Sequence, residues 1–413
     1  MDSGTVRGAR SWLLQRRDLL IVLVVALLAR LGYWVFITPD YSPNSDAAQY
    51  FDLARNIVNG HGYAMTFPQL ELHPTAFRPP GYPYVLAAVF KVFGVDVGVG
   101  AGRVLSLICG LVAIALVYLL VRRISTPLAA LVAGLCMALY PALIANDTVL
   151  LTESLSLALL AGVLLALAVR RWPLAAVLCG MLILTRASAQ YLMFPLALWV
   201  LWQLGWRRAL GFLVIVAAVL SPWFIRNQIQ LGSPYFVTSN GFNLAGTYSP
   251  AARESQRFVD PVIDDRFKRF RLAQFDEADW QDQLQAFAID DLKSHPTQVP
   301  GVLFRNAQHL FEFTPQFNEW AERVDGRNID FRNATLPLFY VVTILGLFGL
   351  VVTRREPLVL LIGAVAAYFV LGSLVLVSPP RLRSPFDLCC CIGVGLAAQW
   401  LSVRRGTGRE ALA

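Results

Sequence analysis

Residues 18–37 read DLLIVLVVALLARLGYWVFI, and residues 42–63, which follow almost directly, read SPNSDAAQYFDLARNIVNGHGY. The first stretch is long and apolar enough to cross a bilayer as a helix. The second is polar, and its spacing predicts a helix that begins at Asp46. A membrane span therefore opens directly into a polar helix with an acidic first turn, which places polar chemistry at the edge of a membrane.

The composition of the whole chain is typical of a membrane protein. Of 413 residues, 56% are hydrophobic and 15% are charged, and the mean hydropathy is +0.56. This predicts an all-α polytopic membrane protein. The net charge of +8 comes largely from six Arg-Arg pairs at the ends of apolar segments. That pattern marks the cytoplasmic side of a membrane protein rather than a nucleic-acid surface, so we expect no nucleic-acid partner.

The arginine pairs also predict the number of crossings. If every apolar segment crossed the membrane, the pairs would fall on both sides. The segment 80–96, PGYPYVLAAVFKVFGVD, is short and contains Pro83 and Lys91, so we expect it to lie in the outer interface. About ten transmembrane helices then remain, with both termini inside. The apolar segments are 18–37, 80–96, 100–121, 128–145, 148–169, 173–187, 189–204, 209–225, 336–353, 357–378 and 386–403.

This topology divides the chain into three parts. Residues 1–225 form an N-terminal transmembrane catalytic module that includes the first outer loop, 38–99. Residues 226–335 form a long extracytoplasmic loop with amphipathic helices, and residues 336–413 form the C-terminal transmembrane helices and a cytoplasmic tail. The short segments 173–187 and 189–204 are expected to form a tilted or half-crossing hairpin. The six cysteines lie within or at the edges of apolar segments, where we expect small buried side chains rather than disulfides.

The first outer loop carries two candidate site residues. Ser45 is expected to cap the helix that begins at Asp46, with Tyr50 on the same face. Asp46 either stabilises the helix N-terminus or acts as a general base at the membrane surface, and both interpretations stay open. Arg78 precedes two prolines that stiffen the backbone, and it serves either as a membrane-edge anchor or as a guanidinium placed to bind phosphate.

Two further turns carry charged residues. In NDTVLLTES, residues 146–154, Asp147 either caps the next helix or contributes a carboxylate. Glu153 is expected one to two turns inside that spanning helix, where a buried carboxylate is functional by default. Arg186 lies at the tip of the predicted hairpin, in LTRAS. Arg381 and Arg383 lie in the last outer turn, SPPRLRSPFD. Arginines are normally enriched in cytoplasmic loops, so two of them on the outer side indicate an anionic ligand.

The start of the long loop contains amide-rich sequence. Arg226 and Asn227 lie where a helix is expected to leave the membrane. Residues 239–243, SNGFN, are expected to form a polar turn, and amides such as that of Asn243 suit sugar hydroxyls as well as ordinary loops. His61 and His73 lack recognisable metal-ligand spacing, so no cofactor is assigned, although a divalent cation stays open.

Taken in order, these motifs carry a family likeness. With ARNIVNGHGY, FRPPGYPYVLAAVFKVFG, LTES, LTRAS, PWFIRN and RLRSPFD, the chain resembles the GT-C glycosyltransferases, in particular the bacterial protein-mannosyltransferase-like and aminoarabinose-transferase-like branch. The resemblance implies a GT-C-like helical bundle that transfers a sugar from a polyprenyl phosphate to an acceptor on the outer face, usually with inversion. Some relatives have an acidic residue where this chain has Ala76, which weighs against a metal site.

The resemblance also implies roles for individual residues. Asp46 matches the catalytic base, and Asp147 occupies the place of a second-loop carboxylate. Arg78 resembles a lipid-phosphate contact. The remaining expected substrate contacts are Tyr50, Glu153, Arg186, Arg226, Asn227, Asn243, Arg381 and Arg383.

The implied partners are a polyprenyl-phosphate-linked sugar donor, an acceptor that is a glycan, lipid or protein, and the bilayer. The implied location is the bacterial inner membrane, with the site on the periplasmic face. A transporter or flippase of a lipid-linked saccharide is the alternative, and it would place charges near the midplane of several helices. A non-catalytic scaffold is a third hypothesis.

Overall fold

The computed structural model describes residues 3–68, 71–263 and 276–410, and the regular secondary structure of these residues is helical apart from one short ladder. In that ladder, β1 (Ala64–Met65) pairs antiparallel with β2 (His73–Pro74). Six helical segments are long and apolar enough to cross a bilayer, which makes this a multi-pass membrane protein. They comprise α1 (Ser3–Gly32) with the π-helical turn η1 (Tyr33–Ile37), α4 (Gly98–Ile124), α10 (Trp206–Leu231), α16 (Ile329–Val352), α17 (Pro357–Val375) and α18 (Ser384–Glu410).

Shorter apolar helices complete the bundle. They are α5 (Pro127–Leu139), α6 (Pro141–Asn146), α7 (Glu153–Ala168), α8 (Trp172–Thr185) and α9 (Met193–Leu204). With the six long helices, α5, α7, α8 and α9 correspond to the ten predicted spans, and complete crossing by these four stays a prediction. The helix α3 (Gly81–Phe93) has 13 residues and is about 20 Å long, which is too short for a bilayer core of about 30 Å. This length agrees with the predicted interfacial position of 80–96.

Close helix contacts hold the bundle together. The C-terminal helix α18 packs against α16, α5 and α17. At the α16–α18 crossing, a Cβ on Gly349 would lie 1.8 Å from the Gly393 carbonyl oxygen. Only glycine permits this backbone approach, as is common where membrane helices meet.

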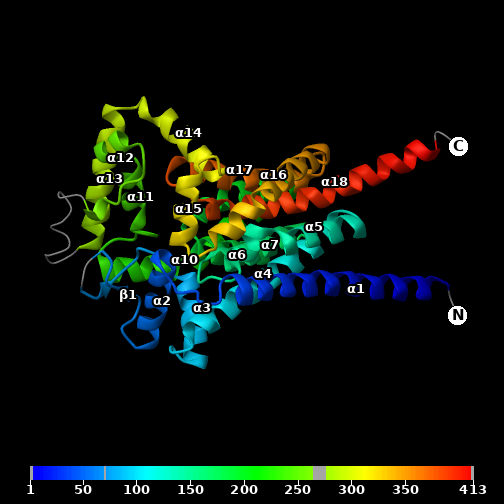
Figure 1. The fold of residues 1–413 in the computed structure, drawn as a ribbon, viewed down its shortest axis with the longest axis horizontal. Coiled ribbons are helices and arrows are strands. Elements are labelled where there is room, and N and C mark those ends of the chain that lie inside the picture. The colour runs from blue at the N-terminus through cyan, green and yellow to red at the C-terminus, as the bar shows by residue number, and fades with distance from the viewer. Residues whose placement is uncertain (1–2, 69–70, 264–275, 411–413) are drawn as a thin grey trace.

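The polar elements gather at one end of the bundle, in what we call the head: the described residues of 38–97 and 232–328. Figure 1 shows the head at one end and both chain termini at the other, as expected for an even number of crossings. The head contains α2 (Ser45–Val58), α3, β1, β2, α11 (Ser239–Thr247), α12 (Pro250–Ser255), η3 (Pro261–Ile263), α13 (Glu277–Ser294), α14 (Gln298–Leu310) and α15 (Pro315–Val324).

The first outer loop and the long loop share one hydrophobic core. Tyr63 of the first loop, Trp223 of α10 and Trp280 of α13 are buried in the same cluster. The Tyr63 and Trp223 rings lie edge to face, with centroids 5.0 Å apart. The head is therefore a packed platform that supports the side chains at the bundle end. The predicted polar turn at 239–243 is wrong, because these residues begin helix α11.

Candidate active site

Asp46 lies in the first turn of α2. The predicted cap is wrong: Asn44 is the N-cap and accepts a hydrogen bond from the Ser45 backbone N at 2.8 Å, while Ser45 is the first helical residue. Ser45 has a φ of 48°, in the left-handed region, where a non-glycine residue costs about 1–3 kcal/mol. This strained start places the Asp46 carboxylate at the positive end of the helix dipole.

Two guanidinium groups hold the Asp46 carboxylate. Arg78 Nη2 donates to Oδ1, and Arg381 Nη2 donates to Oδ2. Burial by itself would raise the pKa of Asp46, but the two arginines outweigh it and lower the pKa to about 2. Asp46 is therefore ionised at neutral pH and can accept a proton.

The Arg78 side chain is fixed on several sides. Its Nε donates to Gln49 Oε1 at 2.7 Å, and its guanidinium carbon lies 5.6 Å from the centre of the Tyr50 ring. Pro79 and Pro80 stiffen the backbone that follows. The structure thus brings Asp46, Tyr50 and Arg78 together, as the sequence predicted.

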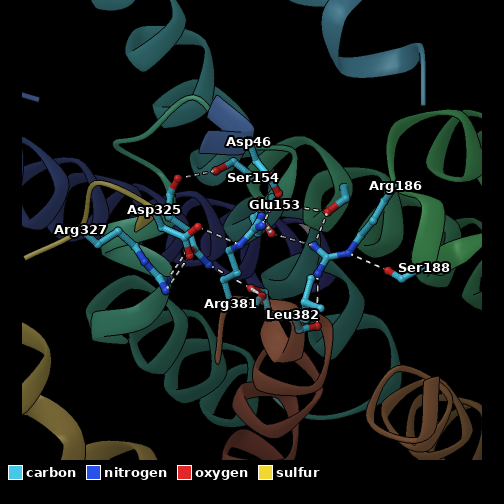
Figure 2. A network of polar contacts seen from close by, with 12 residues as sticks. Asp46, Glu153, Ser154, Arg186, Ser188, Asp325, Arg327, Arg381 and Leu382 are labelled. Atoms are coloured by element: carbon cyan, nitrogen blue, oxygen red, sulfur yellow. Dashed lines mark hydrogen bonds and ion pairs between the residues drawn. The ribbon is translucent and has the colours of Figure 1, made fainter. Parts of the chain in front are cut away.

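Arg381 is the centre of the cluster (Figure 2). It lies in the short helix η5 (Pro380–Arg383) and contacts three carboxylates. Besides Asp46, these are Glu153, with Nη1 to Oε1 at 3.3 Å, and Asp325, with Nε to Oδ1 at 3.0 Å. Glu153 is the first residue of α7, not one to two turns inside it, and its side chain is buried.

Arg186 lies on the other side of Glu153. Its Nη1 is 3.5 Å from Glu153 Oε1, its Nε donates to Ser188 Oγ at 3.0 Å, and its Nη2 donates to the Leu382 carbonyl at 3.2 Å. Arg186 follows α8 and begins the turn through η2 (Ala187–Ala189) into α9, so the predicted pair of short helices is present, and their tilted or half-crossing position stays a prediction. Glu153 Oε2 has no hydrogen-bond partner among the described residues.

The sequence did not single out the turn after α15, which contributes a carboxylate to the cluster. Burial raises the pKa of Asp325 to about 6, against the lowering effect of Arg381 and Arg327. Arg327 also pairs with Glu322, Nη2 to Oε1, at 2.6 Å. The only signal in the sequence is a group of charges in an outer loop, RVDGRNID, which has no periodicity to mark it.

Asp147 has a different partner. It pairs with Arg30 of α1, Nε to Oδ2 at 2.7 Å, and both side chains are buried. Arg30 also donates to the Ala138 carbonyl at 2.9 Å. Asp147 does not cap α7, since Thr152 is the N-cap. Among the described residues, no polar contact given by the structure joins Asp147 directly to Asp46, so the geometry favours a structural ion pair.

Three other predicted contacts lie outside the cluster. Arg226 donates to the carbonyls of Thr75 at 2.6 Å and Tyr63 at 2.8 Å, which ties α10 to the first loop. Asn227 donates to the Tyr235 carbonyl at 2.7 Å. Asn243 lies on α11, where its carbonyl accepts from Thr247 at 2.9 Å. These residues support the head rather than the cluster.

Arg383 belongs to a second charged group. Its Nη2 is 2.5 Å from Glu312 Oε1, and its Nε is 3.3 Å from Asp387 Oδ1. The guanidinium also lies over the Phe339 ring, 3.8 Å from its centre. Of the two arginines predicted in the last outer turn, Arg381 therefore faces Asp46 and Arg383 faces away.

The charges of the first cluster balance. Three carboxylates face three guanidinium groups, and Arg381 occupies the point at which the carboxylates converge. Within the part of the chain that the structure describes, no group of three or more His, Cys, Asp or Glu side chains could hold a metal ion. His73 Nε2 lies 3.3 Å from Glu277 Oε2. Each arginine of the cluster is paired with at least one of its carboxylates. The cluster consists of Asp46, Glu153, Asp325, Arg78, Arg186 and Arg381.

Comparisons with known proteins agree with this fold. Residues 77–225 match the family model described as dolichyl-phosphate-mannose-protein mannosyltransferase. The oligosaccharyltransferase AglB from Archaeoglobus fulgidus, solved with an inhibitory peptide and a dolichol-phosphate, is 15% identical, with a TM-score of 0.57. The alignment covers 96% of this chain and 51% of that AglB chain. The predicted resemblance to the GT-C transferases is confirmed.

Other GT-C structures are similar as well. The apo oligosaccharyltransferase from Archaeoglobus fulgidus is 15% identical over 96% of this chain and 51% of its own, with a TM-score of 0.54. ArnT from Cupriavidus metallidurans, bound to undecaprenyl phosphate, is 14% identical over 95% of this chain and 78% of its own, with a TM-score of 0.44. No curated protein sequence matches. The chain thus spans about half the length of the AglB structures that share its GT-C fold.

Proposed function

We propose that this protein is a membrane glycosyltransferase that moves a sugar from a polyprenyl-phosphate donor to an acceptor hydroxyl on the extracytoplasmic face, with inversion. The observation that carries the proposal is the Asp46 carboxylate held between Arg78 and Arg381 at the head end of an apolar bundle. The arginine pairs support the orientation, because Arg122–Arg123, Arg170–Arg171 and Arg354–Arg355 lie at helix ends opposite the head. A bacterial inner membrane is the proposed location.

The proposed domain division follows the earlier prediction. Residues 1–225 supply Asp46, Arg78, Glu153 and Arg186, and residues 336–413 supply Arg381. The loop 226–335 supplies Asp325 and packs against the first loop through the core of the head. In this proposal, all three parts contribute to one site.

The chemistry begins with the phosphate of the donor. A phosphodiester that binds Arg186 and Arg381 competes with the carboxylates for their N–H groups. This weakens the hold of Arg381 on Asp46 and raises the pKa of Asp46 from about 2 toward its ordinary value. Donor binding thus turns a weakly basic, ion-paired carboxylate into a better proton acceptor.

Transfer then needs one bond to form and one to break. The acceptor oxygen attacks the anomeric carbon, the bond from that carbon to the phosphate oxygen breaks, and the phosphate leaves with the electron pair. The acceptor hydroxyl becomes acidic as the new bond forms, so its proton passes to Asp46. Arg186 and Arg381 stabilise the charge that the departing phosphate gains.

The test is transfer of labelled sugar in proteoliposomes from polyprenyl-phosphate mannose, glucose, galactose and arabinose, with cell-envelope extract as acceptor. Asp46→Asn should lower transfer roughly 100-fold or more, the usual effect of losing general-base catalysis. Asp52→Asn is the matched control, because Asp52 lies on the same helix, is 43% exposed and pairs only with Arg55 in the contacts that the structure gives. Undiminished transfer in folded Asp46→Asn would refute the assignment. Movement of the intact donor across the bilayer without a transfer product would favour the flippase.

A further inference from the structure

Helix α15 and the turn before it carry exposed aromatic rings. In the described part of residues 232–328, three large hydrophobic side chains are exposed: Phe304 at 67%, Phe313 at 64% and Trp320 at 55%. Two of these rings belong to one exposed stripe at the spacing of a single helix face. We call it the α15 stripe, and it consists of Phe313, Gln316, Trp320 and Arg323. Exposed rings that gather on one face indicate a contact surface.

Helix α15 turns polar groups inward and an aromatic ring outward. Its buried face includes Asn318 and Glu322, and Glu322 pairs with Arg327 beside the cluster. A helix on the surface of a soluble domain instead buries its apolar side chains and exposes its polar ones. The outward position of the Trp320 ring therefore suits surroundings that are less polar than water.

The stripe continues the exposed side of a membrane span. The Phe313 ring stacks on Tyr340 of α16, with centroids 5.9 Å apart, and Tyr340 Oη donates to the Phe311 carbonyl oxygen at 3.3 Å. Ile344, one turn further along α16, is 67% exposed, as expected for a side chain that faces lipid. Figure 1 shows α15 where the head meets the bundle, beside the start of α16.

The length of α16 places this contact within the membrane. A hydrocarbon core of about 30 Å takes about 20 residues of a helix that rises about 1.5 Å per residue. Counted from Val352, at the end of α16 opposite the head, the core of a straight crossing reaches about residue 333. Tyr340 lies inside that limit, and tilt of the helix would move the limit further toward Ile329. The Phe313 ring on Tyr340 therefore lies at the depth of the outer leaflet.

The rest of the stripe suits the level of the lipid head groups. Helix α15 begins next to Tyr340 and ends just before α16 starts at Ile329, so it rises from the leaflet toward its outer surface. Tryptophan is enriched where lipid tails meet head groups. Arginine at that level reaches lipid phosphates with its long side chain. Trp320 and Arg323 thus match the interface, as Phe313 matches the layer beneath it.

The same helix carries a carboxylate of the cluster. The Asp325 backbone N donates to the Ala321 carbonyl at 3.0 Å, and the Arg327 backbone N donates to the Glu322 carbonyl at 2.9 Å. These bonds attach the turn with Asp325 to the end of α15. A contact between lipid and the outer face of α15 would therefore act on the element that places Asp325 against Arg381.

We infer that the α15 stripe docks into the outer interface of the bilayer, with the phospholipids of the outer leaflet as its partner. Part of the long loop 226–335 is then embedded in the membrane surface instead of standing in water. The inference is independent of the proposed function, because it depends on the membrane span α16 and on the side chains of α15.

The test is the accessibility of spin labels on the full-length protein in phospholipid nanodiscs. Labels are attached to Phe313→Cys, Gln316→Cys and Trp320→Cys, one variant at a time. Oxygen concentrates in hydrocarbon and a charge-neutral nickel chelate stays in water, so the ratio of their collision rates with a label reports its surroundings. Ile344→Cys is the lipid control, and Asp290→Cys, exposed on α13, is the water control. Wild-type protein gives the background, since five of its six cysteines are buried and Cys136 is half-buried.

Phe313→Cys should give an oxygen-to-nickel ratio close to that of Ile344→Cys and several times that of Asp290→Cys. Gln316→Cys and Trp320→Cys should give ratios between those of the two controls, because the head-group layer contains water. Gln316→Cys removes no ring, so it carries the test if either of the other two variants loses thermal stability.

Two results would overturn the inference. A ratio at Phe313 or Gln316 equal to that of Asp290→Cys would show that the stripe stands in water. Low collision rates with both reagents along the stripe would show that protein, such as a second copy of the chain, covers it in place of lipid.

Discussion

Arg381 donates a hydrogen bond to Asp46 across 335 residues of sequence. Asp46 lies in the first outer loop and Arg381 in the last outer turn, so this contact joins the N-terminal and C-terminal parts of the chain. The same guanidinium also faces Glu153 and Asp325, which makes Arg381 the residue on which the arrangement of the carboxylates depends.

Replacing Arg381 should show this dependence. Arg381→Lys keeps the charge but cannot contact three carboxylates with the geometry of a planar guanidinium. We expect transfer to fall roughly 100-fold or more, because the variant no longer holds the phosphate as arginine does. Steady-state transfer from polyprenyl-phosphate mannose, glucose, galactose and arabinose measures the effect. Arg354→Lys, at an exposed position between α16 and α17, is the control. Equal activity of the two variants would contradict the prediction.

Donor affinity should fall as the pH rises above about 6, the pKa of Asp325. A phosphate bound at Arg381 adds negative charge beside this carboxyl group and raises its pKa further. Binding then takes up a proton, so affinity is highest below the pKa of the free protein and decreases as the pH rises through it.

The measurement is the Kd of the polyprenyl-phosphate sugar that the wild-type protein binds most tightly, between about pH 5.5 and pH 8. As a phosphodiester, the ligand keeps one charge over this range. The other charged groups that face Asp325 are Asp46, Glu153, Glu322, Arg327 and Arg381. The pH dependence should be weaker in Asp325→Asn than in the wild-type protein, and the part that remains is expected from Glu322, whose pKa burial raises to about 7. A Kd that does not change with pH in the wild-type protein would count against the uptake of a proton.

The Arg30–Asp147 pair should matter for stability rather than chemistry. Removing one partner of a buried ion pair costs about 3–5 kcal/mol, because the other charge stays buried without compensation. Asp147→Asn should therefore lower the unfolding temperature in detergent while the folded fraction keeps its rate of transfer.

The double variant Arg30→Met with Asp147→Leu should recover much of that stability, since well-packed apolar residues can replace a buried pair. A loss of turnover in Asp147→Asn protein of normal stability would instead show that this carboxylate takes part in the reaction.

The contact between α16 and α18 predicts a matched pair of glycine variants. Gly349→Val introduces a side chain where a Cβ would already lie 1.8 Å from the Gly393 carbonyl oxygen. Overpacking of this kind costs roughly 1–3 kcal/mol or more. Gly363→Val on α17 is the control, because a Cβ there meets nothing within 4 Å. Thermal unfolding in detergent should separate the two, and similar unfolding temperatures would show that the helices can move apart.

Several features of the fold were predicted because they depend on local sequence. Hydropathy along the chain indicates membrane spans wherever a stretch is long and apolar enough, and the arginine pairs identify one face. The polar helix at Asp46 and the stiff Arg78-Pro79-Pro80 segment were visible for the same reason. Charged side chains of the outer loops were expected to converge, and the structure brings Asp46 and Arg78 into contact, while Asp147 pairs with Arg30.

Other features could not be predicted, because they depend on the partner of a side chain. An arginine at a membrane edge looks the same in the sequence whether it binds a phosphate, a carboxylate or a backbone carbonyl. In the structure Arg226 binds carbonyls and Arg383 pairs with Glu312, and a substrate contact by either residue stays a prediction. Asp325 was missed because a charged loop without periodicity gives no sign of where it folds back.

The sequence by itself thus determined the membrane class, the approximate spans and the acidic helix at the edge of the first one, because hydrophobicity and helix capping act over a few neighbouring residues. Only the tertiary structure decided which arginine faces Asp46, which pairs with Asp147, and which face of α15 is left exposed. These choices depend on how α18, α16 and the head pack, and packing brings together side chains that lie hundreds of residues apart.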